Sequence, residues 1–411
     1  MISIPDTSTL VPVREGDNLY LFPFSGTELV KLDLLFEAGS AYQQHKLGAS
    51  ATAKLMTVAT QAMDSASLAE FMDFRGIVCE TNSEVHQTML TFYFLRRYAD
   101  ELMPVVRDMV CCPRFDDGDF EVWRNRRRQE IMQQERKTST MARRTFYEAI
   151  FGREHPLGRY ATAADIDRLT TDDIKAHHAA YYGLDKMTVV AAGNVEGLDL
   201  HWLTQGASAI DDKVIRNILP PPINSSGVGK NIVMPDATQT SLRVGRILPL
   251  AWDSMDYARF MLLTTVLGGY FGSRLMSNIR EDKGYTYGIY ARTQIYRGVI
   301  VFFITADVAG GMAQAALDEV NKELELLCKE PVADEELKLV KTVLAGDFLR
   351  SVDGIFEKSA RYCDMLGTCV DERLTDNLRS ALQDTTPAQL RDLAQRFLNP
   401  SDMTVCLAGA L

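Results

Sequence analysis

The sequence predicts an α+β protein built from two homologous halves, each a mainly antiparallel sheet with helices packed on one face. Two strand-like segments carry this prediction, because they recur at nearly the same interval along the 411 residues. MTVVAAG, which begins at Met187, returns as MTVCLAG at Met403, 216 residues later, and Phe92-Tyr93 has its counterpart 210 residues on at Phe302-Phe303. A unit of about 200 residues that occurs only twice indicates a duplicated domain and excludes a solenoid.

A linker-like stretch separates the two copies. Pro220 to Lys230, PPPINSSGVGK, has the proline, serine and glycine content of a segment between domains. We therefore expect an N-terminal α+β half over residues 1–215, a linker over 216–231 and a C-terminal α+β half over 232–411.

The first half begins with patterns typical of strands and amphipathic helices. Val30 to Phe36 alternates apolar and charged residues before the turn at Ala38-Gly39-Ser40, which predicts a strand. Gly48 to Met63 is rich in alanine with apolar residues at helical spacing, which predicts a buried helix. The same reasoning gives a helix at Ser67–Gly76, a hairpin over Val78–Leu95, helices at Ala99–Met109 and Phe120–Glu135, a helix capped by Thr170–Asp173 that carries His177 and His178, and a strand at Met187–Ala192.

The net charge argues against nucleic acid as the main partner. The chain carries 44 basic and 55 acidic residues, for a formal charge of −11, whereas binding to phosphates needs a basic surface. The one dense basic run, Arg124 to Arg128, is interrupted by Asn125 and followed closely by Glu130, which is typical of a solvated helix face.

Cysteine use and hydropathy favour a cytoplasmic protein. The seven cysteines are odd in number and form no CxxC pair, as expected of reduced thiols rather than a disulfide framework. The N-terminus lacks the basic and apolar regions of a secretory signal, and no apolar run approaches the ~20 residues of a membrane helix. The glycines follow no dinucleotide-binding spacing, and no Gly-x-Ser-x-Gly motif is present.

The most informative local pattern is Gly268 to Tyr287, GGYFGSRLMSNIREDKGYTY. It predicts a Gly-rich turn, a short amphipathic helix, a break at Gly284 and the start of a strand. Arg280, at the end of the helix, and Tyr287, seven residues later on the strand, would then converge at a helix-to-strand corner. Taken alone, an arginine that ends a helix more often complements the negative end of the helix dipole.

This corner resembles one in the C-terminal halves of the pitrilysin/insulinase-like zinc metallopeptidases, a family that includes the mitochondrial processing peptidase. The segment from His155 to Val195 also resembles the end of that family's first half, and nearly the whole chain from about Val30 onward follows its pattern. The resemblance implies the duplicated LuxS/processing-peptidase-like metallopeptidase fold, and it implies that Arg280 and Tyr287 bind the backbone of a peptide substrate. The residues that match at the corner are Gly268, Gly269, Ser273, Leu275, Arg280, Gly284 and Tyr287.

The same resemblance locates a zinc site that this chain has lost. Active members carry His-x-x-Glu-His on the helix after the first strand, where histidines at i and i+4 share one zinc and the glutamate polarises its water. Here the two histidine positions hold Ala51 and Leu55, and the glutamate position holds Lys54. Alanine and leucine have no donor atom, and lysine is a cation that cannot act as the carboxylate base.

Glu130 stands at the position of the third zinc ligand, 75 residues after the second lost histidine. One carboxylate does not make a zinc site, so a helix-face glutamate paired with Arg127 or Lys54 is the favoured interpretation. No two of the six histidines fall at i and i+4 on one predicted helix, and the adjacent His177 and His178 would point to different faces. We therefore expect no metal on this chain and no catalytic residue in it.

Together these features favour a zinc-less, non-catalytic subunit of a pitrilysin/insulinase-type peptidase. In such a heterodimer a homologous partner would carry the zinc, and this chain would contribute Arg280 and Tyr287 to a shared chamber that holds an extended peptide. Metallopeptidase activity would then exist only in the complex. A structural homologue without a proteolytic role is the alternative, and a stand-alone zinc peptidase is the least favoured. The identity of the peptide and of the partner, and whether the chain forms a homodimer when expressed alone, stay open.

Overall fold

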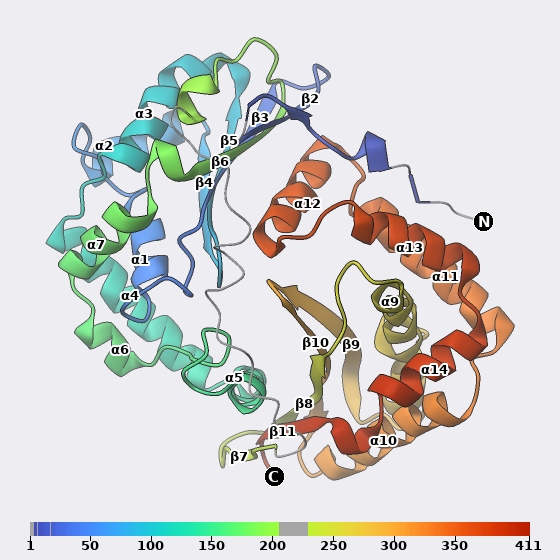
Figure 1. Cartoon of the computed structure of the whole chain (residues 1–411). Coiled ribbons are helices and arrows are strands. Elements are labelled where there is room, and N and C mark those ends of the chain that lie inside the picture. The colour runs from blue at the N-terminus through green and yellow to red at the C-terminus, as the bar shows by residue number, and fades with distance from the viewer. Residues whose placement is uncertain (1–3, 6, 17, 205–228) are drawn as a thin grey trace.

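The computed structural model describes residues 4–5, 7–16, 18–204 and 229–411, and it contains two α+β halves, each with its own sheet (Figure 1). The first sheet is formed by strands between Val13 and Gly193, and the second by strands between Ile232 and Gly409. Most of the predicted linker over 216–231 lies outside the described residues, so its conformation stays a prediction.

The first sheet has six strands in the order β1-β2-β6-β3-β5-β4. All neighbours are antiparallel except β2 and β6, and β4 forms one edge. Leu32 of β3 lies opposite Phe92 of β5, which fixes the register of the centre of the sheet. The strands are β1 (Val13–Arg14), β2 (Leu19–Pro23), β3 (Leu29–Phe36), β4 (Val78–Ser83), β5 (Thr88–Leu95) and β6 (Met187–Gly193).

The second sheet repeats five strands of the first in the same spatial order, β7-β11-β8-β10-β9 against β2-β6-β3-β5-β4. The short β7 is parallel to β11 as β2 is to β6, and the two MTV segments lead into the equivalent strands β6 and β11. The predicted duplication and α+β class are therefore confirmed. The strands are β7 (Ile232–Val233), β8 (Gln239–Leu248), β9 (Thr286–Tyr296), β10 (Val299–Ala309) and β11 (Thr404–Gly409).

Helices of each half cover one face of its own sheet and build its hydrophobic core (Figure 1). Fully buried side chains such as Phe92 and Phe302, one from each sheet, are worth roughly 1.5–3 kcal/mol apiece. In the first half the helices are α1 (Gly48–Leu55), α2 (Ser65–Phe74), α3 (Ala99–Cys111), α4 (Asp117–Glu135), α6 (Ala163–Arg168) and α7 (Thr171–Tyr181). In the second half they are α9 (Met255–Gly268), α10 (Ala313–Lys329), α11 (Asp334–Arg350), α13 (Arg373–Asp384) and α14 (Pro387–Phe397).

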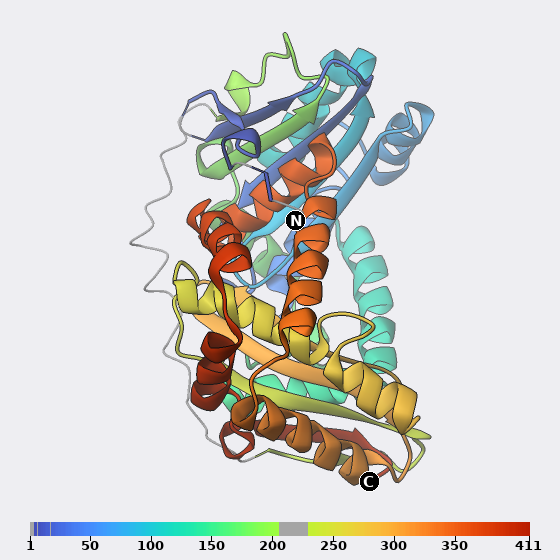
Figure 2. The ribbon, with the colours of Figure 1, turned by 90° about the vertical axis from the view of Figure 1, so that its right-hand side faces the viewer.

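The second face of each sheet, which its own helices leave uncovered, packs against one helix from the other half (Figures 1 and 2). Helix α5 (Thr138–Phe151) packs against β8 and β11, with Phe146 and Ile150 buried against Val301 and Cys406. Helix α12 (Ile355–Thr368) packs in the same way against β2, β3 and β6 of the first sheet. This exchange was not anticipated from the sequence, and it makes the two halves structurally dependent on each other.

The predicted helix over Gly48–Met63 is too long. Helix α1 ends at Leu55, and the hydroxyl of Thr57 donates a hydrogen bond to the main-chain oxygen of Lys54 at this end. The chain then turns so that Thr60 forms a bridge with Pro113. The alanine-rich pattern continues beyond the helix, but tertiary contacts decide where it stops.

All seven cysteines are free thiols. Within the part of the chain that the structure describes, no helix is both long and apolar enough to cross a membrane.

Candidate functional site

The two positions that the resemblance aligned with zinc-binding histidines lie in the hydrophobic interior. Ala51 and Leu55, on one face of α1, are 0% and 2% exposed. They belong to a compact apolar group, here called the α1 cluster, that joins α1 to α4, α6 and α7. The α1 cluster consists of Leu47, Ala51, Leu55, Phe120, Ile131, Ile166, Leu169 and Ile174. Packed hydrocarbon therefore occupies both positions and offers a metal no ligand atom there.

The two polar residues that the resemblance assigned to the same site, Lys54 and Glu130, do not pair with each other. Lys54 is exposed at the end of α1. Glu130 of α4 accepts hydrogen bonds from Arg127 Nη1 at 2.9 Å and Arg126 Nε at 3.1 Å. The hydrogen bond from Arg127 holds the pKa of Glu130 below its usual value, against the opposing effect of partial burial. Glu130 thus pairs with Arg127, one of the two expected partners, and not with Lys54.

No group of three or more metal-binding side chains occurs among the described residues. The adjacent histidines of α7 serve the fold: His177 Nε2 lies 3.0 Å from the main-chain oxygen of Ala38, and His178 Nε2 lies 2.9 Å from that of Val110. Burial lowers the pKa of both imidazoles, which keeps them neutral. They face different elements, as predicted; His177 is buried and His178 is half-buried.

A groove of about 810 Å³ remains open beside the α1 cluster. It runs between α1, α4 and the edge strand β4, whose outward side has no neighbouring strand. The residues that line it are Ser50, Ala53, Lys54, Cys79, Glu80, Thr81, Asn82, Ser83, Met89, Thr91, Trp123, Arg126, Arg127 and Glu130. Burial raises the pKa of the Cys79 thiol to about 12 despite the opposing charge of Lys54, so this cysteine is not an activated nucleophile.

The predicted helix-to-strand corner is present in the second half. Residues Met276–Asp282 form a π-helical turn that begins with buried Met276 and is closed by a hydrogen bond from Lys283 N to Asn278 O, 3.0 Å. Gly284 then takes a left-handed conformation, with φ of +67°, and β9 begins at Thr286. A π-helix is a rare element that occurs most often at functional sites.

Glycine at position 268 allows α9 to approach β9 closely. A Cβ atom there would lie 2.5 Å from the main-chain nitrogen of Ala291, which is too close for any non-glycine residue. Gly268 ends α9 and so sets the position of the corner against the sheet.

Arg280 and Tyr287 lie close in sequence but do not bond to each other in the described contacts. The Arg280 guanidinium stacks on the ring of Phe271, with its Cζ 4.5 Å from the ring centroid. Tyr287 is 97% exposed at the start of the edge strand β9. Neither residue lines the groove at α1, so the corner and the groove are separate features of this chain.

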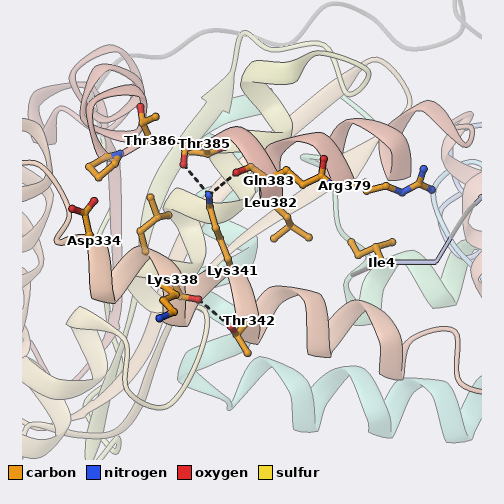
Figure 3. Close-up of a pocket in the computed structure, with 12 residues that line it drawn as sticks. Ile4, Asp334, Lys338, Lys341, Thr342, Arg379, Leu382, Gln383, Thr385 and Thr386 are labelled. Atoms are coloured by element: carbon orange, nitrogen blue, oxygen red, sulfur yellow. Dashed lines mark hydrogen bonds between the residues drawn. The ribbon is translucent and has the colours of Figure 1, made fainter. Parts of the chain in front are cut away.

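A second cavity, of about 590 Å³, lies between α11, α13 and the start of α14 (Figure 3). Two of its charged side chains bind main-chain oxygens. Lys341 Nζ donates hydrogen bonds to the main-chain oxygens of Gln383 and Thr385 at 3.2 and 2.9 Å, and Arg379 donates one to Pro5. Figure 3 shows that Arg379 points away from Lys341, so the cationic groups do not converge on one point. We place no site here.

The two α+β halves, which repeat one strand order, define a class of duplicated folds expected of this metallopeptidase family. Family models agree with this assignment. Residues 25–163 match the model described as "Insulinase (Peptidase family M16)", and residues 168–344 match "Peptidase M16 inactive domain". The chain therefore belongs to the peptidase M16, or insulinase, family.

Relatives include proteins named as peptidases and as non-peptidases. A "Non-peptidase homolog YmxG" of Helicobacter pylori is 24% identical over 327 residues, which cover 75% of this chain and 72% of the relative. An "Uncharacterized zinc protease" of Mycobacterium leprae is 23% identical over 362 residues, covering 84% and 78%. The crystal structure of a peptidase M16 inactive domain from Pseudomonas fluorescens has a TM-score of 0.84 at 21% identity and covers 96% of both chains. At this identity the structural likeness establishes the fold alone.

Proposed function

We propose that this chain is the zinc-less subunit of an M16-type peptidase assembly, and that it holds an extended peptide while a homologous partner carries the zinc. The observation that carries this proposal is the arrangement around α1. An apolar cluster occupies both histidine positions, and Lys54 replaces the catalytic glutamate, whereas the groove along β4 stays open. A chain that retains a peptide-sized groove without metal ligands is suited to binding and not to hydrolysis.

The corner of the second half supplies donors that suit a peptide backbone. Arg280 contributes a guanidinium, and the phenol of Tyr287 is almost wholly exposed to a partner or ligand. Both groups donate hydrogen bonds, which peptide carbonyls and a developing oxyanion accept. An edge strand such as β9 also offers main-chain groups to which an extended peptide can add as a further strand. Attack on the scissile carbonyl would be the task of the partner.

The test is co-expression with a homologue from the same source that carries His-x-x-Glu-His. The complex should cleave peptides, and Arg280→Ala or Tyr287→Phe should lower kcat/KM by roughly 10²–10³-fold if each group acts as an oxyanion donor does. Tyr290→Phe is the matched control, because Tyr290 is also exposed on β9 and the substitution removes the same hydroxyl. Unchanged cleavage by both corner variants would refute the role of the corner.

A structural homologue without a proteolytic role is the second candidate. The name of the Helicobacter pylori relative, a non-peptidase homolog, favours it. The two candidates differ in one measurement: a zinc-bearing partner should need this chain for peptide cleavage under the first proposal, and should cleave equally well without it under the second. Under both, the purified chain should hold no stoichiometric zinc, and metal found bound to it would contradict both.

A further inference from the structure

A buried arginine without an anionic partner lies on the face of the second sheet that α5 covers. Arg243 of β8 is 9% exposed, and its guanidinium stacks on Phe303, with Cζ 4.2 Å from the ring centroid. Its Nη1 is buried and has no hydrogen-bond acceptor in the described structure. Charged groups inside proteins are normally paired because their desolvation is costly, so this environment lacks an anion.

The groups that surround Arg243 are hydrogen-bond donors. Burial lowers the pKa of Arg243, and the neighbours that act on it are Tyr147, Arg143 and Tyr296, with no acidic side chain among them. Arg143 is an exposed residue of α5, one turn before Tyr147, and its positive charge also lowers the pKa of Arg243. Two guanidinium groups that face one region repel each other unless an anion lies between them.

The two tyrosines leave one proton unused. The hydroxyls of Tyr147 and Tyr296 lie 3.0 Å apart, so one donates to the other. Burial raises the pKa of Tyr296, and its phenol therefore stays protonated at neutral pH. Two hydroxyl protons and one mutual hydrogen bond leave a single O–H free to donate to a ligand.

An acidic residue on this face bonds to a serine. Asp307 of β10 accepts a hydrogen bond through Oδ1 from Ser241, its partner across the β8–β10 ladder, and the Ser241 hydroxyl also lies 2.8 Å from the hydroxyl of Thr138. Arg243 lies one pleat further along, opposite Thr305. The neighbours of Arg243 thus supply hydrogen-bond donors, and in the described part of the chain Arg243 forms no ion pair with a carboxylate.

We propose that Arg243, Arg143, Tyr147 and Tyr296 form a binding site for an oxyanion, a carboxylate or phosphate group, at the junction of α5 and the second sheet. A guanidinium offers two parallel donors to such a group, and the phenol adds a third. The site goes beyond the proposed function, because it belongs to this chain alone and needs no partner subunit. A carboxylate could come from a peptide and a phosphate from a small molecule, and the experiment separates the two.

The experiment measures thermal unfolding of the full chain with inorganic phosphate or acetate, at ionic strength held constant with sodium chloride. The wild-type melting temperature should rise by roughly 2 °C or more with at least one of the two anions. Arg243→Met should abolish the rise without lowering the melting temperature in the absence of anion, since it removes an unpaired buried charge. A response to acetate alone identifies a carboxylate ligand, and a response to phosphate alone identifies a phosphate ligand.

Two further variants make the result specific. Arg361→Met is the matched control, because Arg361 also stacks on a phenylalanine ring but donates a hydrogen bond to Thr375 at 2.8 Å; its response to anions should equal that of the wild type. Tyr296→Phe keeps the ring and removes one donor, so it should weaken anion binding by roughly tenfold, measured by calorimetric titration. The absence of any wild-type response, or an equal response of Arg243→Met, would overturn the proposal.

Discussion

Arg297 and Glu37, 260 positions apart in the chain, form a bidentate ion pair between the two halves. Arg297, at the turn between β9 and β10, is buried, and its Nη1 and Nη2 lie 2.5 and 2.6 Å from the two carboxylate oxygens of Glu37. Its Nε also donates to the main-chain oxygen of Gly367 at the end of α12, and Tyr42 donates to Glu37. This guanidinium therefore connects the second sheet to the end of β3 in the first half. It also connects that sheet to α12, the helix of the second half that covers the first sheet.

Removing Glu37 should be costly because it leaves the Arg297 charge buried and unpaired. We expect Glu37→Ala to lower the free energy of unfolding by about 3–5 kcal/mol, the usual cost of breaking a buried pair on one side. Asp347→Ala is the control, since Asp347 forms an exposed pair with Arg350 one helical turn away, and its loss should change stability by less than about 1 kcal/mol. Chemical denaturation measures both. Equal effects of the two substitutions would show that the Arg297–Glu37 pair does not hold the halves together.

A buried histidine beside this pair should make stability depend on pH. Burial, together with the charges of Arg297 and His155, lowers the pKa of His86 from 6.5 to about 3. Between these two pKa values the unfolded chain binds a proton that the folded chain does not. This group therefore does not reduce the free energy of unfolding above pH 6.5, and it reduces it progressively as the pH falls toward 3. At pH 5 the loss from this group is on the order of 2 kcal/mol.

Comparing melting temperatures at pH 7.5 and pH 5 tests this dependence. His86→Phe removes the titrating group and should reduce the loss between the two pH values, whatever its effect at pH 7.5. His45→Gln removes an exposed imidazole and should leave the loss as it is in the wild type. An undiminished loss in His86→Phe would assign the acid sensitivity to other groups.

Placing a histidine at Leu55, a position that the resemblance aligned with a zinc ligand, should destabilise the fold. Leu55→His places an imidazole in the α1 cluster, where it loses apolar contacts and buries a polar group, and we expect a loss of about 2–4 kcal/mol. Lys54→His makes the same new side chain one residue earlier on an exposed position and should cost less than about 0.5 kcal/mol. Thermal unfolding in the presence of a chelator compares the stabilities of the two variants. Equal stability of the two would mean that the α1 cluster is not tightly packed.

The duplication was predictable from segments that recur along the chain, whereas the resemblance to a known family supplied the expected position of the zinc site. Recurring strand segments identified the equivalent β6 and β11, and residue types alone showed that Ala51 and Leu55 cannot bind a metal. The burial of these two residues is a further finding, since the sequence did not say what would fill the vacated space. The pairing of Glu130 with Arg126 follows from helical spacing of four residues and could have been found from it.

The exchange of α5 and α12 could not be predicted from periodicity. An amphipathic pattern shows that a helix has an apolar face, but it does not say which sheet that face covers. Phe146 of α5 meets Cys406 of β11, and Cys363 of α12 meets Leu35 of β3, across most of the length of the chain. The Arg243 site was missed for the same reason, because its four side chains come from three segments that only the fold brings together.

The exchanged helices predict that neither half is stable by itself. Residues 1–215 alone would expose the face of the first sheet that α12 covers, where Phe22, Leu35 and Val190 are buried. The apolar side of α5 would be exposed as well, since the second sheet covers it. Large contiguous apolar surfaces of this kind cause aggregation, so we expect this fragment to be insoluble when expressed without the rest of the chain.

Co-expression of residues 1–215 with residues 216–411 should rescue both fragments as one complex. Each fragment then supplies the helix that the other's sheet requires, and the Arg297–Glu37 pair can form between them. Size-exclusion chromatography should show a single species with the mass of the intact chain, and Phe146→Asp, which places a charge in the contact between α5 and the second sheet, should prevent its formation. Val122→Asp is the control, because Val122 is exposed on α4 and its substitution should leave assembly unchanged. A soluble, folded and monomeric 1–215 fragment would show that the covering helix is dispensable for the first sheet.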